Sequence, residues 1–148
     1  MDALVFRGQP LEYQFRPDAL QREINKAYVT FCAMESGNIV APQENPEPVA
    51  TGNWGCGAFG GDRELKAMIQ WIAASESGRA MLYFTFKDKF LSEPLQNIAN
   101  ALLSANVTVG TLYRAILGMN SQNSNWDTFT FLNSYFNLGL SVPPRPEK

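Results

Sequence analysis

The chain has 148 residues, with 12 basic and 14 acidic side chains, a net charge of −2 and no histidine. This length suits one domain, and a hydrophobic content of 45% can supply a sizeable core. The absence of histidine excludes Ser-His-Asp and Cys-His nucleophile systems. Cys32 and Cys56 alone cannot complete the usual zinc ligand sets, so we expect no metal and a reduced, intracellular setting. An acidic chain is also not expected to bind DNA directly.

No targeting or membrane segment is expected. The N-terminal stretch carries charge at Asp2 and Arg7 and lacks an apolar signal core. No run approaches the roughly 20 apolar residues that span a bilayer. We therefore expect a soluble chain without a membrane partner.

The first periodic segment follows Pro17, which suits a first helical turn. Apolar residues then recur at spacings of three and four, which predicts an amphipathic helix over residues 17–33 with Arg22, Glu23 and Lys26 on its solvent face. Residues 35–48 are rich in proline, glycine and asparagine, which indicates a loop.

A glycine-rich run over residues 52–61 leads directly into a second predicted helix. Asp62 can cap this helix, which we expect to end near Gly78. Residues 80–86 are apolar on both faces and predict a central strand. Pro94 is expected to open a third helix and Thr108 to cap a fourth. The alternation of helices and strands predicts an α/β sheet domain.

The segment 120–148 has a different composition. It begins with an Asn/Ser/Gln-rich stretch, continues with an aromatic cluster from Trp126 to Phe136 and ends in a proline-rich tail that we expect to be disordered. The aromatic cluster is compatible with a packed cap and with a partner-binding segment.

The glycine-rich run is the segment most indicative of chemistry. Glycines allow positive φ and close approach of a ligand to the main chain. Successive N–H groups before a helix N-terminus can converge on an anion such as a diphosphate. A tight structural turn is the alternative, but Trp54 and Phe59 within the run weaken it, because large aromatic rings at a turn need something to pack on.

A dinucleotide-binding interpretation is also open. Gly55, Gly57 and Gly60 match the G-x-G-x-x-G pattern, which is weak by itself. Only three strand-like residues precede the run, and Asp88 lies further away than the usual acidic residue. On this alternative the chain would prefer NAD and depend on Asp88.

Residues 49–62, Val-Ala-Thr-Gly-Asn-Trp-Gly-Cys-Gly-Ala-Phe-Gly-Gly-Asp, resemble the diphosphate-binding loop of poly(ADP-ribose) glycohydrolases. The resemblance extends upstream through Gln14 and the segment 22–28, and downstream through residues 65–70, 83–86, 108–110 and Tyr113. It covers roughly residues 10–117. Residues beyond Asn120 do not share it.

The resemblance implies a macrodomain-like mixed sheet flanked by helices, which binds ADP-ribose or poly(ADP-ribose) without a cofactor. Residues 1–119 would form the C-terminal portion of the catalytic domain, followed by the divergent tail. The loop residues expected to bind the diphosphate are Asn53, Gly55, Cys56, Gly57, Ala58, Phe59, Gly60 and Gly61. Within this loop, Asn53 would help to fix its shape. Phe86 would stack on the adenosine; its alternative role is that of a core residue in a central strand.

The resemblance also implies what this chain lacks. Family members cleave the ribose–ribose O-glycosidic bond with a Gln-Glu-Glu signature upstream of the loop, and this chain contains no Glu-Glu pair. We therefore expect no catalytic residue here, and a chain that is inactive alone and marginally folded. A truncated product, a gene fragment and a degenerate paralogue all fit, as does a non-catalytic ADP-ribose-binding module. The family works in the nucleus and cytoplasm.

Overall fold

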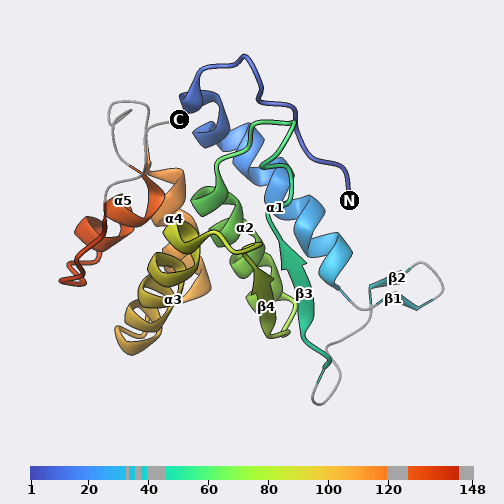
Figure 1. Cartoon of the computed structure of the whole chain (residues 1–148). Coiled ribbons are helices and arrows are strands. Elements are labelled where there is room, and N and C mark those ends of the chain that lie inside the picture. Colours follow the sequence, from blue (N-terminus) through green and yellow to red (C-terminus); the bar gives the residue numbers. More distant parts are fainter. Residues whose placement is uncertain (33, 36–37, 40–45, 120–126, 144–148) are drawn as a thin grey trace.

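The computed structural model describes residues 1–32, 34–35, 38–39, 46–119 and 127–143 (Figure 1). Its elements in chain order are η1 (Leu11–Phe15), α1 (Pro17–Phe31), β1 (Met34–Glu35), β2 (Asn38–Ile39), β3 (Val49–Gly52), α2 (Arg63–Glu76), β4 (Met81–Phe84), α3 (Lys89–Ser104), α4 (Val109–Leu117) and α5 (Thr128–Tyr135). None of the helices described is both long and apolar enough to cross a membrane.

The central unit is a parallel βαβ arrangement. β3 pairs with β4 in a register that runs from Val49–Met81 to Gly52–Phe84, and α2 makes the connection between the two strands. β1 and β2 form a separate antiparallel pair. The α/β class is therefore confirmed, but the strands in the described ranges form only these two small pairs, and helices predominate.

The core lies around α2. α1 lies beside α2, and α3, α4 and α5 gather on the other side of it (Figure 1). Fully buried apolar side chains from each of the α-helices described above meet here, among them Leu20, Met68, Ile98, Ile116 and Phe129. The packing fixes the start of α2, and with it the end of the glycine-rich loop.

Three of the predicted helices begin where the sequence signals them. α1 starts at Pro17, Asp62 Oδ1 accepts a hydrogen bond from Leu65 N at the start of α2, and Thr108 Oγ1 accepts one from Thr111 N at the start of α4. The placement of Glu23 on the solvent face of α1 is wrong, because this side chain is 1% exposed.

The predicted start of the third helix is wrong. α3 begins at Lys89, and Pro94 lies inside it. A proline at this position removes one helical hydrogen bond. Pro94 itself and the leucines on either side of it, Leu91 and Leu95, are buried, so packing of this stretch outweighs the loss.

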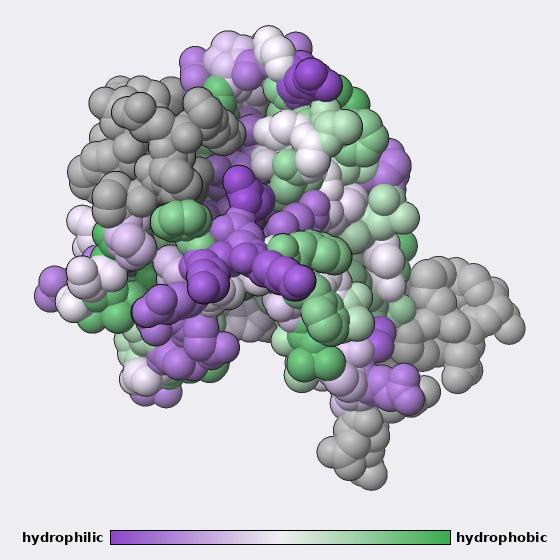
Figure 2. Space-filling model, in the orientation of Figure 1, coloured by the Kyte–Doolittle hydropathy of each residue, from purple (hydrophilic) through white to green (hydrophobic). Residues whose placement is uncertain are grey.

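β4 is not the central, doubly covered strand that its composition predicts. Its residues alternate in exposure: Leu82 and Phe84 are 53% and 57% exposed, whereas Met81 and Tyr83 pack against the hydrophobic clusters. Only one face is covered because α2 lies on one side of the small sheet. Apolar surface over β4 is visible in Figure 2, next to hydrophilic side chains that gather over the starts of α2 and α3.

The aromatic cluster of the C-terminal segment contributes to the core where it is described. Phe129 and Leu132 of α5 are fully buried, and Asp127 caps the helix by accepting from Thr130 N. Phe129 N also donates to Glu64 Oε2 of α2 at 2.9 Å. These residues thus pack as a cap on the domain; Trp126 and the last five residues lie outside the described ranges.

Candidate ligand-binding site

The glycine-rich loop joins the end of β3 to the start of α2. Its backbone folds back on itself through Gly61 N, which donates to Gly55 O at 2.8 Å. Two smaller turns lie beside this closure: Cys56 N donates to Asn53 O at 3.1 Å and Gly60 N to Gly57 O at 3.0 Å. The loop is therefore a closed, hydrogen-bonded structure rather than an open linker.

Two of its glycines are required by backbone conformation. Gly55 has φ +75° and Gly60 has φ +73°, in the left-handed region that side chains disfavour. Each is also tightly packed: a Cβ at Gly55 would lie 2.7 Å from Ala3 Cβ, and one at Gly60 would lie 3.1 Å from Arg7 N. The N-terminal segment thus covers one side of the loop.

Three consecutive amides remain available for a ligand. Within the described ranges, the N–H groups of Gly57, Ala58 and Phe59 donate to no acceptor. A Cβ at Gly57 would meet nothing within 4 Å, so open space adjoins the backbone there. Adjacent unpaired amides next to open space are the arrangement by which a backbone nest binds an oxyanion.

The N-terminal segment and η1 hold this loop by side-chain and backbone hydrogen bonds. Gln14, which is 5% exposed, donates from Nε2 to Gly60 O at 3.2 Å and accepts from Asp62 N at 2.6 Å. Phe6 N and Arg7 N both donate to Phe59 O. Apart from the position of Gln14 in the family-like segment, no feature of the sequence predicts that it belongs to the site.

Asn53 is fixed from the neighbouring strand. The Tyr83 hydroxyl donates to Asn53 Oδ1 at 3.0 Å. Burial raises the pKa of the Tyr83 hydroxyl well above its usual value, so it remains a neutral donor across the physiological range. This contact links the loop to β4, which ends next to it.

Phe86 is exposed, and the alternative that makes it a core residue is wrong. The side chain is 76% exposed and the residue has φ +55°, which is uncommon for a non-glycine residue. Its ring lies over the end of β3, since a Cβ at Gly52 would be 2.8 Å from Phe86 Cε2. Phe59, the other ring assigned to the ligand, is 44% exposed. Both rings present apolar surface close to the loop.

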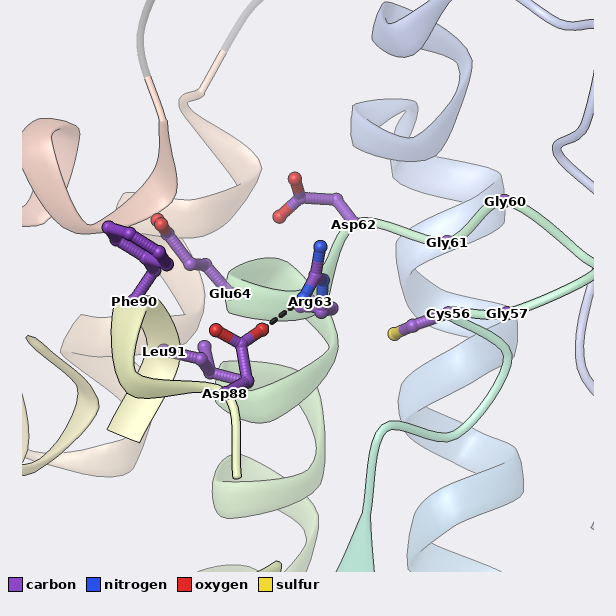
Figure 3. Close-up of a pocket in the computed structure, with 10 residues that line it drawn as sticks. All are labelled: Cys56, Gly57, Gly60, Gly61, Asp62, Arg63, Glu64, Asp88, Phe90 and Leu91. Carbon is purple, nitrogen blue, oxygen red and sulfur yellow. Dashed lines mark hydrogen bonds and ion pairs between the residues drawn. The ribbon is translucent and has the colours of Figure 1, made fainter. Parts of the chain in front are cut away.

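A cavity of about 410 Å³ lies between the loop and the starts of α2 and α3 (Figure 3). Cys56, Gly57, Gly60 and Gly61 line it from the loop, and Arg63, Glu64, Asp88, Phe90 and Leu91 line it from the helical side. Arg63 and Asp88 point toward each other and form an ion pair. The Asp88 carboxylate, on which the dinucleotide interpretation depends, is therefore already engaged.

A buried charged pair lies beneath the loop, and the sequence analysis missed it. Lys66 of α2 and Glu23 of α1 form an ion pair in which both residues are 1% exposed. Burial lowers the pKa of Lys66, and Glu23 partly opposes this effect. The available signal was the position of Lys66 between Leu65 and Ala67, on the apolar stretch of a helix that follows the loop.

A strand, a glycine-rich loop and a helix in this parallel arrangement form a βαβ unit, which defines an α/β domain. The family model for "Poly (ADP-ribose) glycohydrolase (PARG), Macro domain fold" matches residues 1–93. The chain therefore belongs to the poly(ADP-ribose) glycohydrolase family.

Individual relatives agree with this assignment. The chain is 32% identical to probable poly(ADP-ribose) glycohydrolase 2 of Arabidopsis thaliana, over 87% of this chain and 31% of that protein. It is 49% identical to poly(ADP-ribose) glycohydrolase 1 of the same plant, over 50% of this chain and 14% of that protein. Poly(ADP-ribose) glycohydrolase 1 of Caenorhabditis elegans is 31% identical, over 88% of this chain and 16% of its own length. The chain thus spans less than a third of the curated relatives it matches.

Proposed function

We propose that this chain forms the diphosphate- and adenosine-binding part of a poly(ADP-ribose) glycohydrolase catalytic domain. The observation that carries the proposal is the row of available amides at Gly57, Ala58 and Phe59, beside a cavity and before the start of α2. Backbone donors at a helix start can bind a diphosphate without a basic surface. This suits a chain whose net charge is −2.

The two exposed rings would recognise the rest of the ADP-ribose unit. Phe86 would stack on the adenosine, and Phe59 would pack beside the ribose-phosphate portion. Stacking of a base on an aromatic side chain contributes about 1–3 kcal/mol in single-stranded nucleic-acid sites. Asn53 would keep the loop in register with β4 through its hydrogen bond with Tyr83.

The complete domain would hydrolyse ribose–ribose O-glycosidic bonds of poly(ADP-ribose). Such hydrolysis needs a carboxylic acid at the scissile bond. The sequence has no Glu-Glu pair, and the carboxylates around the cavity are engaged locally: Asp62 caps α2, Glu64 accepts from Phe129 N, and Asp88 pairs with Arg63. The catalytic glutamates would therefore be supplied from outside these 148 residues, and we expect this chain alone to be inactive.

A calorimetric titration with ADP-ribose tests the binding function. Gly57→Glu directs a carboxylate from the loop into the space beside the free amides, where no atom opposes its Cβ. We expect the wild-type chain to show saturable binding and Gly57→Glu to lose it by at least about 10-fold, which corresponds to about 1.4 kcal/mol. Gly110→Glu is the matched control, since a Cβ at Gly110 also meets nothing within 4 Å.

The same titration separates ADP-ribose binding from dinucleotide binding. Binding without release of ADP-ribose from the polymer is expected both of a part of a catalytic domain and of a non-catalytic binding module; an open reading frame that continues before Met1 and encodes a Gln-Glu-Glu signature would favour the first. Preference for NAD over ADP-ribose, with loss on Asp88→Ala, would favour the dinucleotide alternative. If the wild-type chain melts cooperatively and binds neither ligand, the proposed diphosphate site is refuted.

A further inference from the structure

Lys66 is an unusual residue for the interior of this domain. It is among the largest of the fully buried side chains in the described ranges, with 1% exposure, and its ammonium group lies under the glycine-rich loop rather than in solvent. A buried ammonium is costly unless it is paired. Its position against Gly55 and Gly61, at the two ends of the loop that carries the candidate anion site, raises the question of what its charge does there.

The partner of Lys66 is itself held from several sides. Glu23 Oε2 accepts from Lys66 Nζ, whereas Glu23 Oε1 accepts from Arg22 Nη1 at 2.8 Å and from Leu4 N at 3.2 Å. Glu23 therefore joins α1, α2 and the N-terminal segment. Because Arg22 shares this carboxylate, the group of charges formed by Lys66, Glu23 and Arg22 carries one more positive charge than negative.

The loop rests on the end of the Lys66 side chain. A Cβ at Gly55 would lie 3.4 Å from Lys66 Nζ, and a Cβ at Gly61 would lie 3.2 Å from Lys66 Cε. These two glycines are the residues whose backbones close the loop by hydrogen bonding to each other. Lys66 thus lies beneath the closure point.

Trp54 is held against the same ammonium. Lys66 Nζ lies 4.0 Å from the centre of the Trp54 ring, a distance at which a cation and an aromatic face attract each other. The buried Trp54 Nε1 has no hydrogen-bond partner within the described part of the chain. The ring is therefore oriented by its face contact with Lys66 and not by its polar edge.

From these contacts we infer that Lys66 is a positioning residue of the diphosphate site, which supports the closed loop from below and attracts the bound diphosphate with its buried positive charge. Only the second half of this inference, the attraction of the bound diphosphate, rests on the proposed function. Its first half, that Lys66 keeps the loop closed, concerns the protein without ligand.

A cycle of four proteins tests both halves: wild type, Lys66→Met, Glu23→Gln and the double variant. Lys66→Met leaves a buried carboxylate without its main partner, so we expect a loss of stability toward urea. The double variant removes both charges and should recover most of that loss, because a neutral pair of similar shape carries little penalty. Comparison of the double variant with wild type therefore shows the effect of losing the buried charges in a protein whose stability is largely retained.

The ligand-free readout is hydrogen exchange of the Gly61 amide, which donates to Gly55 O in the closed loop. We expect exchange at this amide to be at least about 10-fold faster in the double variant than in wild type, while amides of α4 stay unchanged. Equal Gly61 exchange in a double variant of wild-type stability would overturn the positioning role. This result does not depend on whether ADP-ribose binds.

The ligand readout is the ADP-ribose affinity across the same four proteins. We expect the double variant to bind at least about 10-fold more weakly than wild type. Glu23→Gln should bind no more tightly than wild type, because the buried Lys66 ammonium loses the carboxylate that keeps it protonated. Affinities of wild type and double variant within twofold of each other would overturn the attraction. Failure of wild type to bind would refute the proposed function and the attraction together, whereas faster Gly61 exchange would still support the positioning role.

Discussion

Replacing Gln14 with alanine examines how strongly the loop depends on the segment before α1. In the structure this one side chain accepts from Asp62 N at 2.6 Å and donates to Gly60 O at 3.2 Å. Removing the acceptor of a buried amide costs about 1–3 kcal/mol, and a lost neutral hydrogen bond adds about 0.5–1.5 kcal/mol. We therefore expect Gln14→Ala to lower the free energy of unfolding by about 1.5–4.5 kcal/mol.

Urea unfolding and thermal melting measure this loss. In a domain of about 150 residues each kcal/mol shifts the melting temperature by roughly 2–4 °C, so the expected shift is roughly 3–18 °C downward. Gln96→Ala is the control, because Gln96 is exposed and donates to the neighbouring Asn100 on the surface of α3. Its stability should stay within about 0.5 kcal/mol of wild type.

Gln14→Glu separates the two hydrogen bonds. The glutamate keeps an acceptor for Asp62 N but places a carboxylate oxygen where Nε2 donates to the Gly60 carbonyl. We expect ADP-ribose binding to weaken in this variant, because the carbonyl of Gly60 is repelled and the loop opens. The role of Gln14 in holding the loop is contradicted if Gln14→Ala unfolds with wild-type stability. It is also contradicted if Gln14→Glu binds ADP-ribose as tightly as wild type does.

Two further outcomes follow from the exposed ring and the buried hydroxyl. Phe86→Ala should weaken ADP-ribose binding by about 5- to 150-fold, the equivalent of about 1–3 kcal/mol of stacking. Stability toward urea should change little, because the ring is 76% exposed. Unchanged affinity in a folded variant would show that Phe86 is not part of the site. The raised pKa of Tyr83 means that the folded chain holds this proton above about pH 10, where an unfolded tyrosine loses it. The contribution to stability is complete below about pH 10 and declines as the pH rises toward the folded pKa, by up to about 1.4 kcal/mol per pH unit. Tyr83→Phe should make alkaline unfolding less steep, and identical slopes in the two proteins would contradict the burial argument.

Local signals in the sequence predict much of the helical framework. Pro17, Asp62 and Thr108 mark helix starts because proline at a first turn and a short polar cap satisfy groups that the helix leaves unpaired. The glycine-rich run also predicts the backbone of the site, since Gly55 and Gly60 do have positive φ. These features depend on residues close together in the chain.

The wrong predictions concern features set by distant contacts. Whether β4 is covered on one face or two depends on which elements pack there, and the apolar residues Leu82 and Phe84 look alike in sequence in either case. The polarity of Glu23 predicts solvent exposure, but the ammonium of Lys66, 43 positions away, draws it into the interior. Pro94 looks like a helix start until the burial of Leu91 shows that the helix has already begun.

The contacts of the loop bear on how tightly it can bind. Residues from the N-terminal segment, η1, α2 and β4 all contact it, so the loop is shaped by the fold before any ligand is present. Ordering a flexible loop on binding would consume part of the interaction energy, whereas a loop already closed leaves that energy for affinity. The amides at Gly57, Ala58 and Phe59 form a consecutive row that this closure leaves unpaired. A ligand with two adjacent phosphates supplies the acceptors that the closed loop lacks, which is why the same contacts that stabilise the fold also define the class of ligand.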